Sequence, residues 1–169
     1  MSSPPLTPLA AAALRIVPAP ERVLEIECAN GDGSLFLARE FPAARVRGID
    51  RSADKIRAAT GRVGLDPEGR IAFKQGSPSS IPYPSAFFDL VVAIDGRPAV
   101  AEVVRVLSPG GHLILASSSG DAVFAGAGGR FLRWRLERRG VELMESAEAG
   151  DGSFVVGRLR SGDAAAVGG

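Results

Sequence analysis

The chain has 169 residues, 46% of them hydrophobic, which suits one domain with a substantial buried core. Its net charge of +1 gives no bulk signal for a nucleic acid or an anionic membrane as partner. A single cysteine, Cys28, excludes an internal disulfide and a cysteine-based zinc cluster, and fits a reducing compartment. No apolar run reaches about 18 residues, so we expect a cytoplasmic protein without a membrane span.

Predicted helices and strands alternate through the first half of the chain. Residues 1–6 are expected to be loose, and Thr7 can cap a short helix that runs to about Ile16. No Lys or Arg precedes this apolar segment, so a helix packed on the sheet is favoured over a secretion signal. The elements that follow are a strand (Arg22–Cys28), a helix (about Gly33–Phe41), a strand (Arg45–Ile49), a helix (Ala53 to about Arg62) and a strand (Ile71–Lys74).

The second half continues the alternation and closes with two adjacent strands. The apolar run Phe88–Ile94 is typical of a central strand covered on both faces. It is followed by a helix (Pro98 to about Leu107), a turn (Ser108–Gly111), a strand (His112–Ala116), a small-residue loop (Ser117–Gly129), a helix (Arg130–Arg139) and two strands (Val141–Met144 and Phe154–Leu159). This order predicts a three-layer α/β fold whose mostly parallel sheet has one reversed strand near an edge. Residues 1–160 are expected to form one domain, followed by a disordered tail over 161–169.

The stretch between Arg22 and Asp50 carries the clearest functional pattern. An apolar strand runs into a small-residue turn at residues 27–31, the turn opens a helix, and the next strand ends on Asp50. This is how a chain builds a nucleotide-type pocket at the carboxyl ends of parallel strands. The turn lets the backbone approach a ligand, and Asp50 can accept hydrogen bonds from two ribose hydroxyls.

Four motifs together resemble the class I methyltransferases that use S-adenosylmethionine, in particular those of methyltransferase type 11. They are Val-Leu-Glu-Ile at 23–26, Gly-Ile-Asp at 48–50, Ile-Pro-Tyr-Pro with Phe-Phe-Asp-Leu-Val-Val at 81–84 and 87–92, and Glu-Val-Val-Arg-Val-Leu-Ser-Pro-Gly-Gly-His-Leu at 102–113. The resemblance covers residues 22 to about 160. It implies a Rossmann-like sheet of seven strands in the order 3-2-1-4-5-7-6, strand seven antiparallel, with S-adenosylmethionine as cofactor.

The resemblance implies roles for residues at the strand ends. Glu25 would lie near the methionine end of the cofactor, and Gly31 would let the backbone pass close to it. Asp50 would hold the ribose, with Arg51 alongside. The end of the fourth strand, Ala93 to Asp95, would line the reactive side, where Asp95 is the candidate catalytic base.

The glycine-rich turn departs from the family pattern. The family would place glycine at 27, 29 and 31, where this chain has Glu27, Ala29 and Gly31. Glu27 adds a negative charge where the ligand's carboxylate would lie, and two charges about 4 Å apart repel by about 1 kcal/mol in water. In a shifted register, Glu27 is the acid and residues 29, 31 and 33 form the turn. We favour the first register, because the second would bury Glu25 in a central strand.

The adenine loop also departs from the family. Ser77 and Pro78 would face the adenine, where an acidic residue often stands at 77 and a backbone N–H is often donated at 78. Ser77 accepts a hydrogen bond only without charge assistance, and Pro78 has no N–H to give. A lost donor to a buried acceptor costs on the order of 1–3 kcal/mol, so these changes are expected to weaken cofactor binding.

Two further features are interpreted as structural. His112, the only histidine, starts the fifth strand on the far side from the expected pocket. The helix over Arg130–Arg139 holds five arginines, which could bind phosphates. It is interpreted instead as a solvated face opposite four apolar residues, Phe131, Leu132, Trp134 and Leu136, so a nucleic-acid partner is not expected.

These patterns favour a methyltransferase that acts on a small-molecule acceptor. No metal is expected, because after the fifth strand only Asp121 could join Asp95 as a ligand. The chain carries little lid of its own, so the pocket would be open or completed by a second subunit in a homodimer. The alternative is a non-catalytic relative that has lost the cofactor. A nicotinamide-dependent oxidoreductase ranks third, because the turn lacks Gly-x-Gly-x-x-Gly.

Overall fold

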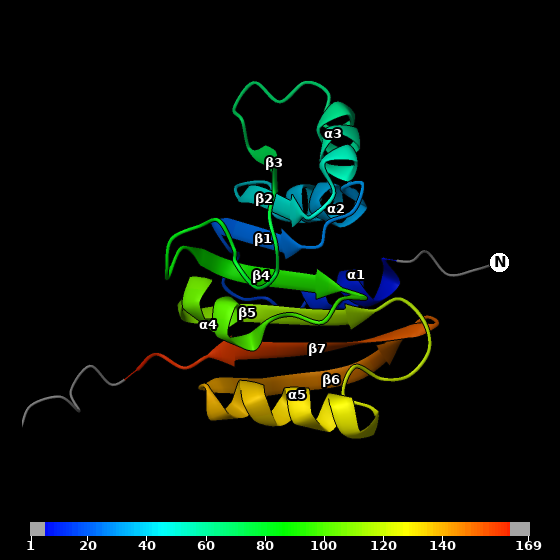
Figure 1. The fold of residues 1–169 in the computed structure, drawn as a ribbon, viewed down its shortest axis with the longest axis vertical. Helices are drawn as coiled ribbons and strands as arrows, with labels where there is room; N and C mark the ends of the chain where they lie inside the picture. Colours follow the sequence, from blue (N-terminus) through cyan, green and yellow to red (C-terminus); the bar gives the residue numbers. More distant parts are fainter. Residues whose placement is uncertain (1–5, 163–169) are drawn as a thin grey trace, which may run out of the picture.

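The computed structural model describes residues 6–162, in which helices and strands alternate along the chain (Figure 1). The first five strands and their helices are α1 (Thr7–Ala13), β1 (Arg22–Ile26), α2 (Asp32–Glu40), β2 (Arg45–Asp50), α3 (Ala53–Arg62), β3 (Ile71–Gln75), β4 (Phe88–Ile94), α4 (Val100–Val106) and β5 (Leu107–Ser117). The chain closes with α5 (Gly126–Arg138), β6 (Val141–Ala149) and β7 (Gly152–Leu159).

All seven strands form one sheet in the order β3-β2-β1-β4-β5-β7-β6. Strands β1 to β5 pair in parallel, and β7 runs antiparallel to both of its neighbours. The predicted fold class and strand order are thereby confirmed. Because the five parallel strands share one direction, their carboxyl ends meet at a single edge, and the loops that follow them can build one site.

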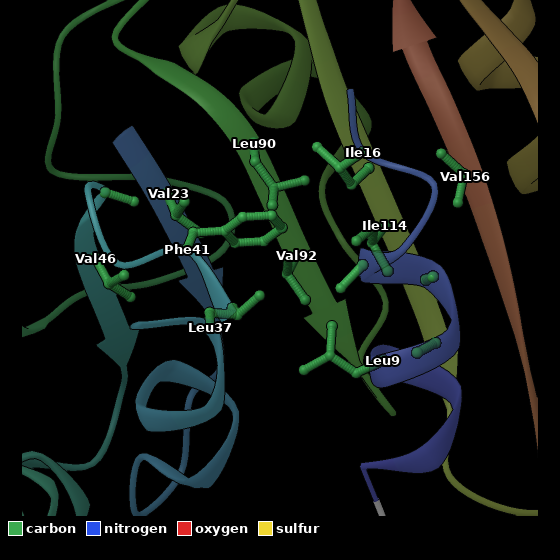
Figure 2. Close-up of a cluster of buried hydrophobic side chains, with 14 of the residues drawn as sticks. Leu9, Ile16, Val23, Leu37, Phe41, Val46, Leu90, Val92, Ile114 and Val156 are labelled. Carbon is green, nitrogen blue, oxygen red and sulfur yellow. The ribbon is translucent and has the colours of Figure 1, made fainter. Parts of the chain in front are cut away.

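The sheet is covered on both faces, and each face has its own apolar cluster. On one face, α1 and α2 contribute Leu9 and Leu37, which pack against Val23 and other strand residues (Figure 2). On the other face, α4 and α5 pack against the alternate residues of the same strands, such as Leu24. Successive strand side chains point to opposite faces, which explains why the central strands are apolar throughout.

Among the parallel strands, the predicted boundaries of β1 and β5 are wrong by two residues or more. Strand β1 ends at Ile26 instead of Cys28, because the backbone turns into the left-handed region at Glu27, with φ 54°. Residues 108–111, predicted as a turn before the fifth strand, belong to β5. The pairing of β5 with β4 is interrupted between the pairs Phe88↔Leu107 and Leu90↔His112. The Pro and Gly residues predicted to form a turn therefore form a bulge within the strand.

Other boundaries differ at the helix and hairpin ends. Helix α5 begins at Gly126, four residues before the predicted start, and α1 ends earlier than predicted, at Ala13. The Gly-Ala-Gly-Gly opening of α5 has poor helix propensity, which hides its first turn from a sequence pattern. The closing hairpin is longer than predicted, with β6 reaching Ala149 and β7 starting at Gly152.

Three other expectations concern the chain as a whole. The single domain over residues 1–160 stays a prediction. Most of the segments expected to be loose or disordered, residues 1–5 and 163–169, lie outside the described part of the chain. Over residues 6–162, none of the helices has the length and apolar character required to cross a bilayer.

Candidate functional site

The turn after β1 has left-handed backbone at three alternate residues. The φ angles are 54° at Glu27, 49° at Ala29 and 91° at Gly31. These are the positions at which the first register places the family's glycines, and Gly33 is instead the second residue of α2. Only glycine adopts this region without strain. The backbone therefore matches the first register, with two of the three glycines replaced.

Glu25 is buried beneath this turn, with 3% of its surface exposed. It accepts a 2.9 Å hydrogen bond from Ser34 Oγ at the start of α2. Burial raises the pKa of Glu25 to about 8, from an ordinary value of 4.5. The expectation that the first register spares Glu25 from burial is wrong, because a protonated carboxyl with one hydrogen-bond partner is tolerated there. The side chain braces the turn from below and does not line a cavity.

Asp50, at the end of β2, ties two loops together. Its Oδ2 accepts the Ala29 N–H at 3.0 Å and its Oδ1 accepts the Ser52 N–H at 2.9 Å. Ser52 also caps α3 as predicted, accepting the Lys55 N–H at 3.3 Å. A carboxylate oxygen can accept more than one hydrogen bond, so Asp50 retains the capacity to bind hydroxyl groups.

A cavity of about 390 Å³ opens above Asp50 at the carboxyl edge of the sheet. Its lining consists of residues from the first, second and fourth strand ends: Glu27, Ala29, Asp50, Arg51, Ser52, Lys55 and Ile94. Four of the nine residues predicted to bind the cofactor are therefore brought together here. Ile94 belongs to the strand end that was predicted to line the reactive side. The sequence analysis did not name Ser52 and Lys55 as ligands, although they cap and open the helix after β2.

The Glu27 side chain crosses this edge from β1 toward β4. Its Oε1 lies 3.9 Å from Arg51 Nη2, and a Cβ added at Gly96 would lie 2.6 Å from its Oε2. The Glu27 side chain is 36% exposed, so it can swing without leaving a buried charge unpaired. The residues present thus fit a ribose at the Asp50 end, and they place the Glu27 carboxylate at the other.

A second cavity, of about 530 Å³, lies beyond the ends of β4 and β5. Asp95 stands at its rim with left-handed backbone, φ 57°, and its two oxygens accept the Ser118 N–H at 2.7 Å and the Ser118 Oγ–H at 2.5 Å. Asp95 therefore bridges two strand ends. The apolar part of the lining includes Val100, Leu115, Ala116, Phe131 and Leu132, and the charged part consists of Asp95, Asp121, Arg97 and Arg135.

The remaining predicted ligands lie apart from the two cavities' linings. Ser77 Oγ bonds Ser79 Oγ at 2.9 Å within a short turn, and Pro78 is buried. Ala93 is 2% exposed beneath the end of β4, and Gly31 is buried in the turn itself. The Gly76 N–H donates to the Asp50 carbonyl at 3.0 Å, which keeps the Ser77 loop next to the end of β2.

His112 and Cys28 have surroundings that suit structural roles. His112 borders a third cavity, at the opposite edge of the sheet. Burial lowers the pKa of His112. Burial raises the pKa of the Cys28 thiol to about 12, so it stays protonated and unreactive at neutral pH. Within residues 6–162, no three His, Cys, Asp or Glu side chains gather as metal ligands would.

Comparison with known proteins identifies the family. A family model described as a methyltransferase domain matches residues 23–111, more than half of the chain. A fatty-acid O-methyltransferase of Mycolicibacterium smegmatis is 33% identical over 101 residues, 56% of this chain and 36% of that protein. A demethylmenaquinone methyltransferase of Deinococcus radiodurans is 33% identical over 113 residues, 63% of this chain and 46% of that protein. The chain spans less than half the length of these curated relatives.

Solved structures share the fold. A SAM-dependent methyltransferase from Aquifex aeolicus superposes with a TM-score of 0.67 at 16% identity, covering 82% of each chain. The cyclase SpnF superposes with a TM-score of 0.73 at 19% identity, covering 90% of this chain and 80% of that one. The chain belongs to the methyltransferase-domain family, as its motifs suggested. This membership indicates S-adenosylmethionine as the cofactor.

Proposed function

We propose that this protein transfers a methyl group from S-adenosylmethionine to a small, mainly apolar acceptor. The observation that carries the proposal is the cavity above Asp50, which adjoins the turn of the matched family domain. Two relatives support the acceptor class, because they are named for fatty acids and for demethylmenaquinone. The free, buried cysteine supports the cytoplasmic location that we also propose.

The cavity above Asp50, the smaller of the two, would bind the cofactor. Asp50 would accept hydrogen bonds from the ribose hydroxyls, while the Ala29 and Ser52 N–H groups keep its carboxylate oriented. A side chain at Gly31 would meet the Phe73 ring and Ala59, so this glycine would act indirectly, by letting the turn pack closely beneath the cavity. Bound S-adenosylmethionine supplies an already activated sulfonium methyl. The chain's own contribution is then alignment of an acceptor and exclusion of water.

The larger cavity would hold the acceptor, since it adjoins the first at the end of β4. Its apolar residues suit a hydrocarbon body. Arg97 and Arg135 would bind a polar or anionic group, because neither has an acidic partner in the described chain. Asp95 remains the candidate base. Acting as a base would require one of its oxygens to exchange its Ser118 hydrogen bond for one from the acceptor.

Calorimetric titration with S-adenosylhomocysteine, the demethylated cofactor, tests the proposal. We expect binding to the wild type and a loss of 10- to 100-fold, on the order of 1.4–2.8 kcal/mol, in Asp50→Ala. Asp89→Ala is a matched control, because Asp89 also accepts two backbone N–H groups, from Glu21 and Arg22, at the opposite edge of the sheet. Equal losses in both variants, or no binding to the wild type, would refute the cofactor site.

The alternative is a non-catalytic protein that keeps the fold without the cofactor. It is favoured by the Glu27 carboxylate, which lies in the lining of the cavity above Asp50. The triple variant Glu27→Gly, Ser77→Asp and Pro78→Ala distinguishes the two. If it creates affinity for S-adenosylhomocysteine that the wild type lacks, the alternative stands; tight binding by the wild type removes it.

A further inference from the structure

Helix α5 presents two aromatic side chains to solvent. Phe131 is 57% exposed and Trp134 is 51% exposed. Their rings stack on one another, with centroids 5.7 Å apart and planes at 22°. The prediction that these residues lie on the buried side of the helix is wrong. Exposed large aromatics that form a contiguous pair are uncommon on a surface that contacts only water.

The packing of α5 on the sheet explains this orientation. Leu136 is fully buried, Leu132 is half-buried, and Gly129 is buried against the Phe124 backbone. A Cβ at Gly129 would lie 2.3 Å from the Phe124 carbonyl carbon, so the first turn of the helix packs closely there. With residues 129, 132 and 136 inward, helical geometry directs 131 and 134 outward.

Arginines surround the aromatic pair. Arg135 lies over the Phe131 ring, 5.9 Å from its centroid, and Arg138 lies over the Trp134 ring at 5.4 Å. Arg130 is exposed one turn before Trp134, and no acid partners it within residues 6–162. Of the helix's arginines, Arg133 has an acidic partner, Glu137, at 3.1 Å. The net charge of +1 therefore hides a basic, aromatic face on α5. This helix lies beside β6, at one end of the sheet (Figure 1).

We propose that this face, formed by Arg130, Phe131, Trp134, Arg135 and Arg138, docks on the surface of an anionic phospholipid bilayer. Aromatic rings flanked by arginine fit the boundary between headgroups and acyl chains. Each arginine near an anionic leaflet adds electrostatic attraction. Each ring already stacks on the other and has an arginine over it, so little ring surface is open to a base, which favours a bilayer over single-stranded nucleic acid.

The docking face adjoins the larger cavity, so docking would bring the cavity mouth to the membrane surface. Phe131 and Arg135 belong both to the face and to the cavity lining. An apolar molecule that resides in a bilayer would thus reach the cavity at the membrane surface. Only this consequence rests on the proposed function, because docking itself requires neither cofactor nor acceptor.

The single tryptophan of the chain, Trp134, reports on docking directly. Titration with phosphatidylglycerol vesicles at low salt should shift its emission to shorter wavelength, and phosphatidylcholine vesicles should not. Vesicle flotation provides an independent measure. Arg130→Gln with Arg138→Gln should weaken binding to phosphatidylglycerol by about 30-fold. Raising the salt to about 0.5 M should release the protein, because screening shortens the reach of these charges.

The matched control removes two arginines from the other end of the sheet. Arg39 and Arg45 are exposed, so Arg39→Gln with Arg45→Gln should fold and bind vesicles like the wild type. Circular dichroism checks the fold of both double variants. The proposal is overturned if neither vesicle binds, if both bind equally, or if the control variant loses as much affinity. It is also overturned if an oligonucleotide or a second copy of the chain occupies the face and vesicles do not.

Discussion

Non-glycine residues with left-handed backbone concentrate where the two cavities open. Four such residues are described: Glu27, Ala29, Ala86 and Asp95. All but Ala86 follow the ends of β1 and β4 at the carboxyl edge of the sheet. Each such position costs on the order of 1–3 kcal/mol and persists only where its surroundings hold it. Asp50 holds Ala29, and Ser118 holds Asp95, so carboxylate hydrogen bonds compensate this strain.

Two variants of Glu27 separate the effect of its strained backbone on stability from the effect of its negative charge on cofactor binding. Glu27→Gly should raise the free energy of unfolding by about 1 kcal/mol, because glycine adopts φ 54° without strain. It should also tighten S-adenosylhomocysteine binding by about 5-fold, by removing a like charge near the ligand's carboxylate. Glu27→Gln keeps the strained backbone and should improve binding alone. Weaker binding in both variants would instead mean that Glu27 holds the ligand's ammonium group.

Glu25 gives stability a pH dependence of definite sign. Its pKa is raised to about 8 in the folded protein, against 4.5 ordinarily. Between these values the unfolded chain releases the proton and the folded chain keeps it. Stability from this group is therefore complete below pH 4.5 and falls as pH rises to about 8, by up to about 1.4 kcal/mol per pH unit.

Glu25→Gln isolates this effect, since the amide oxygen can still accept the Ser34 hydrogen bond and does not titrate. Urea unfolding at pH 5, 6.5 and 8 should show the variant gaining stability relative to the wild type as pH rises. A difference between variant and wild type that stays constant over this range would show that Glu25 titrates normally.

At the scale of elements, the close approach of α2 to β1 depends on Gly33. A Cβ at this position would lie 1.9 Å from Glu25 Oε2, a buried atom with little room to move. Gly33→Ala should therefore destabilise the protein by about 1–3 kcal/mol. Gly61→Ala, in α3, meets no atom within 4 Å and should stabilise by up to about 1 kcal/mol through helix propensity.

Urea unfolding of the two alanine variants provides the comparison. Combining Gly33→Ala with Glu25→Ala should remove most of the penalty, because the shortened side chain no longer meets the new methyl group. A Gly33→Ala variant as stable as Gly61→Ala would contradict the close packing at the start of α2.

Most elements could be predicted because their apolar patterns and caps are local. The sequence predicts β4 to the residue, since a central strand is apolar on both faces, and α3 through the Ser52 cap. The start of α5 could not be predicted, because tertiary packing of Gly129 overrides poor glycine propensity. The outward position of Trp134 could not be predicted either, because an aromatic residue in a helix is usually buried.

For the whole molecule, strand order and the position of the main cavity follow from the order of motifs. Asp50 and the turn at 27–31 meet because parallel strands share one edge, which a sequence can foretell. Side-chain direction is different. Glu25 points beneath the turn because its partner Ser34 lies on the next helix, α2, whereas Ser77 bonds Ser79 within its own loop and so does not face the cavity. Nothing in the sequence marks Arg97 and Arg135 as neighbours, because only the fold brings them to one cavity.

The carboxyl edge of the sheet holds two cavities, and either could in principle hold the cofactor. Amide hydrogen exchange, which reports on every part of the chain, distinguishes them. S-adenosylhomocysteine should slow amide exchange at residues 27–31 and 50–52, whose loops flank the smaller cavity. Exchange in α5 and in the β6–β7 hairpin should not change, because these elements contribute nothing to that lining. At a ligand concentration equal to the wild-type Kd, Asp50→Ala should lose most of this protection. Protection centred on residues 126–135 would instead assign the cofactor to the larger cavity and leave the one above Asp50 for the acceptor.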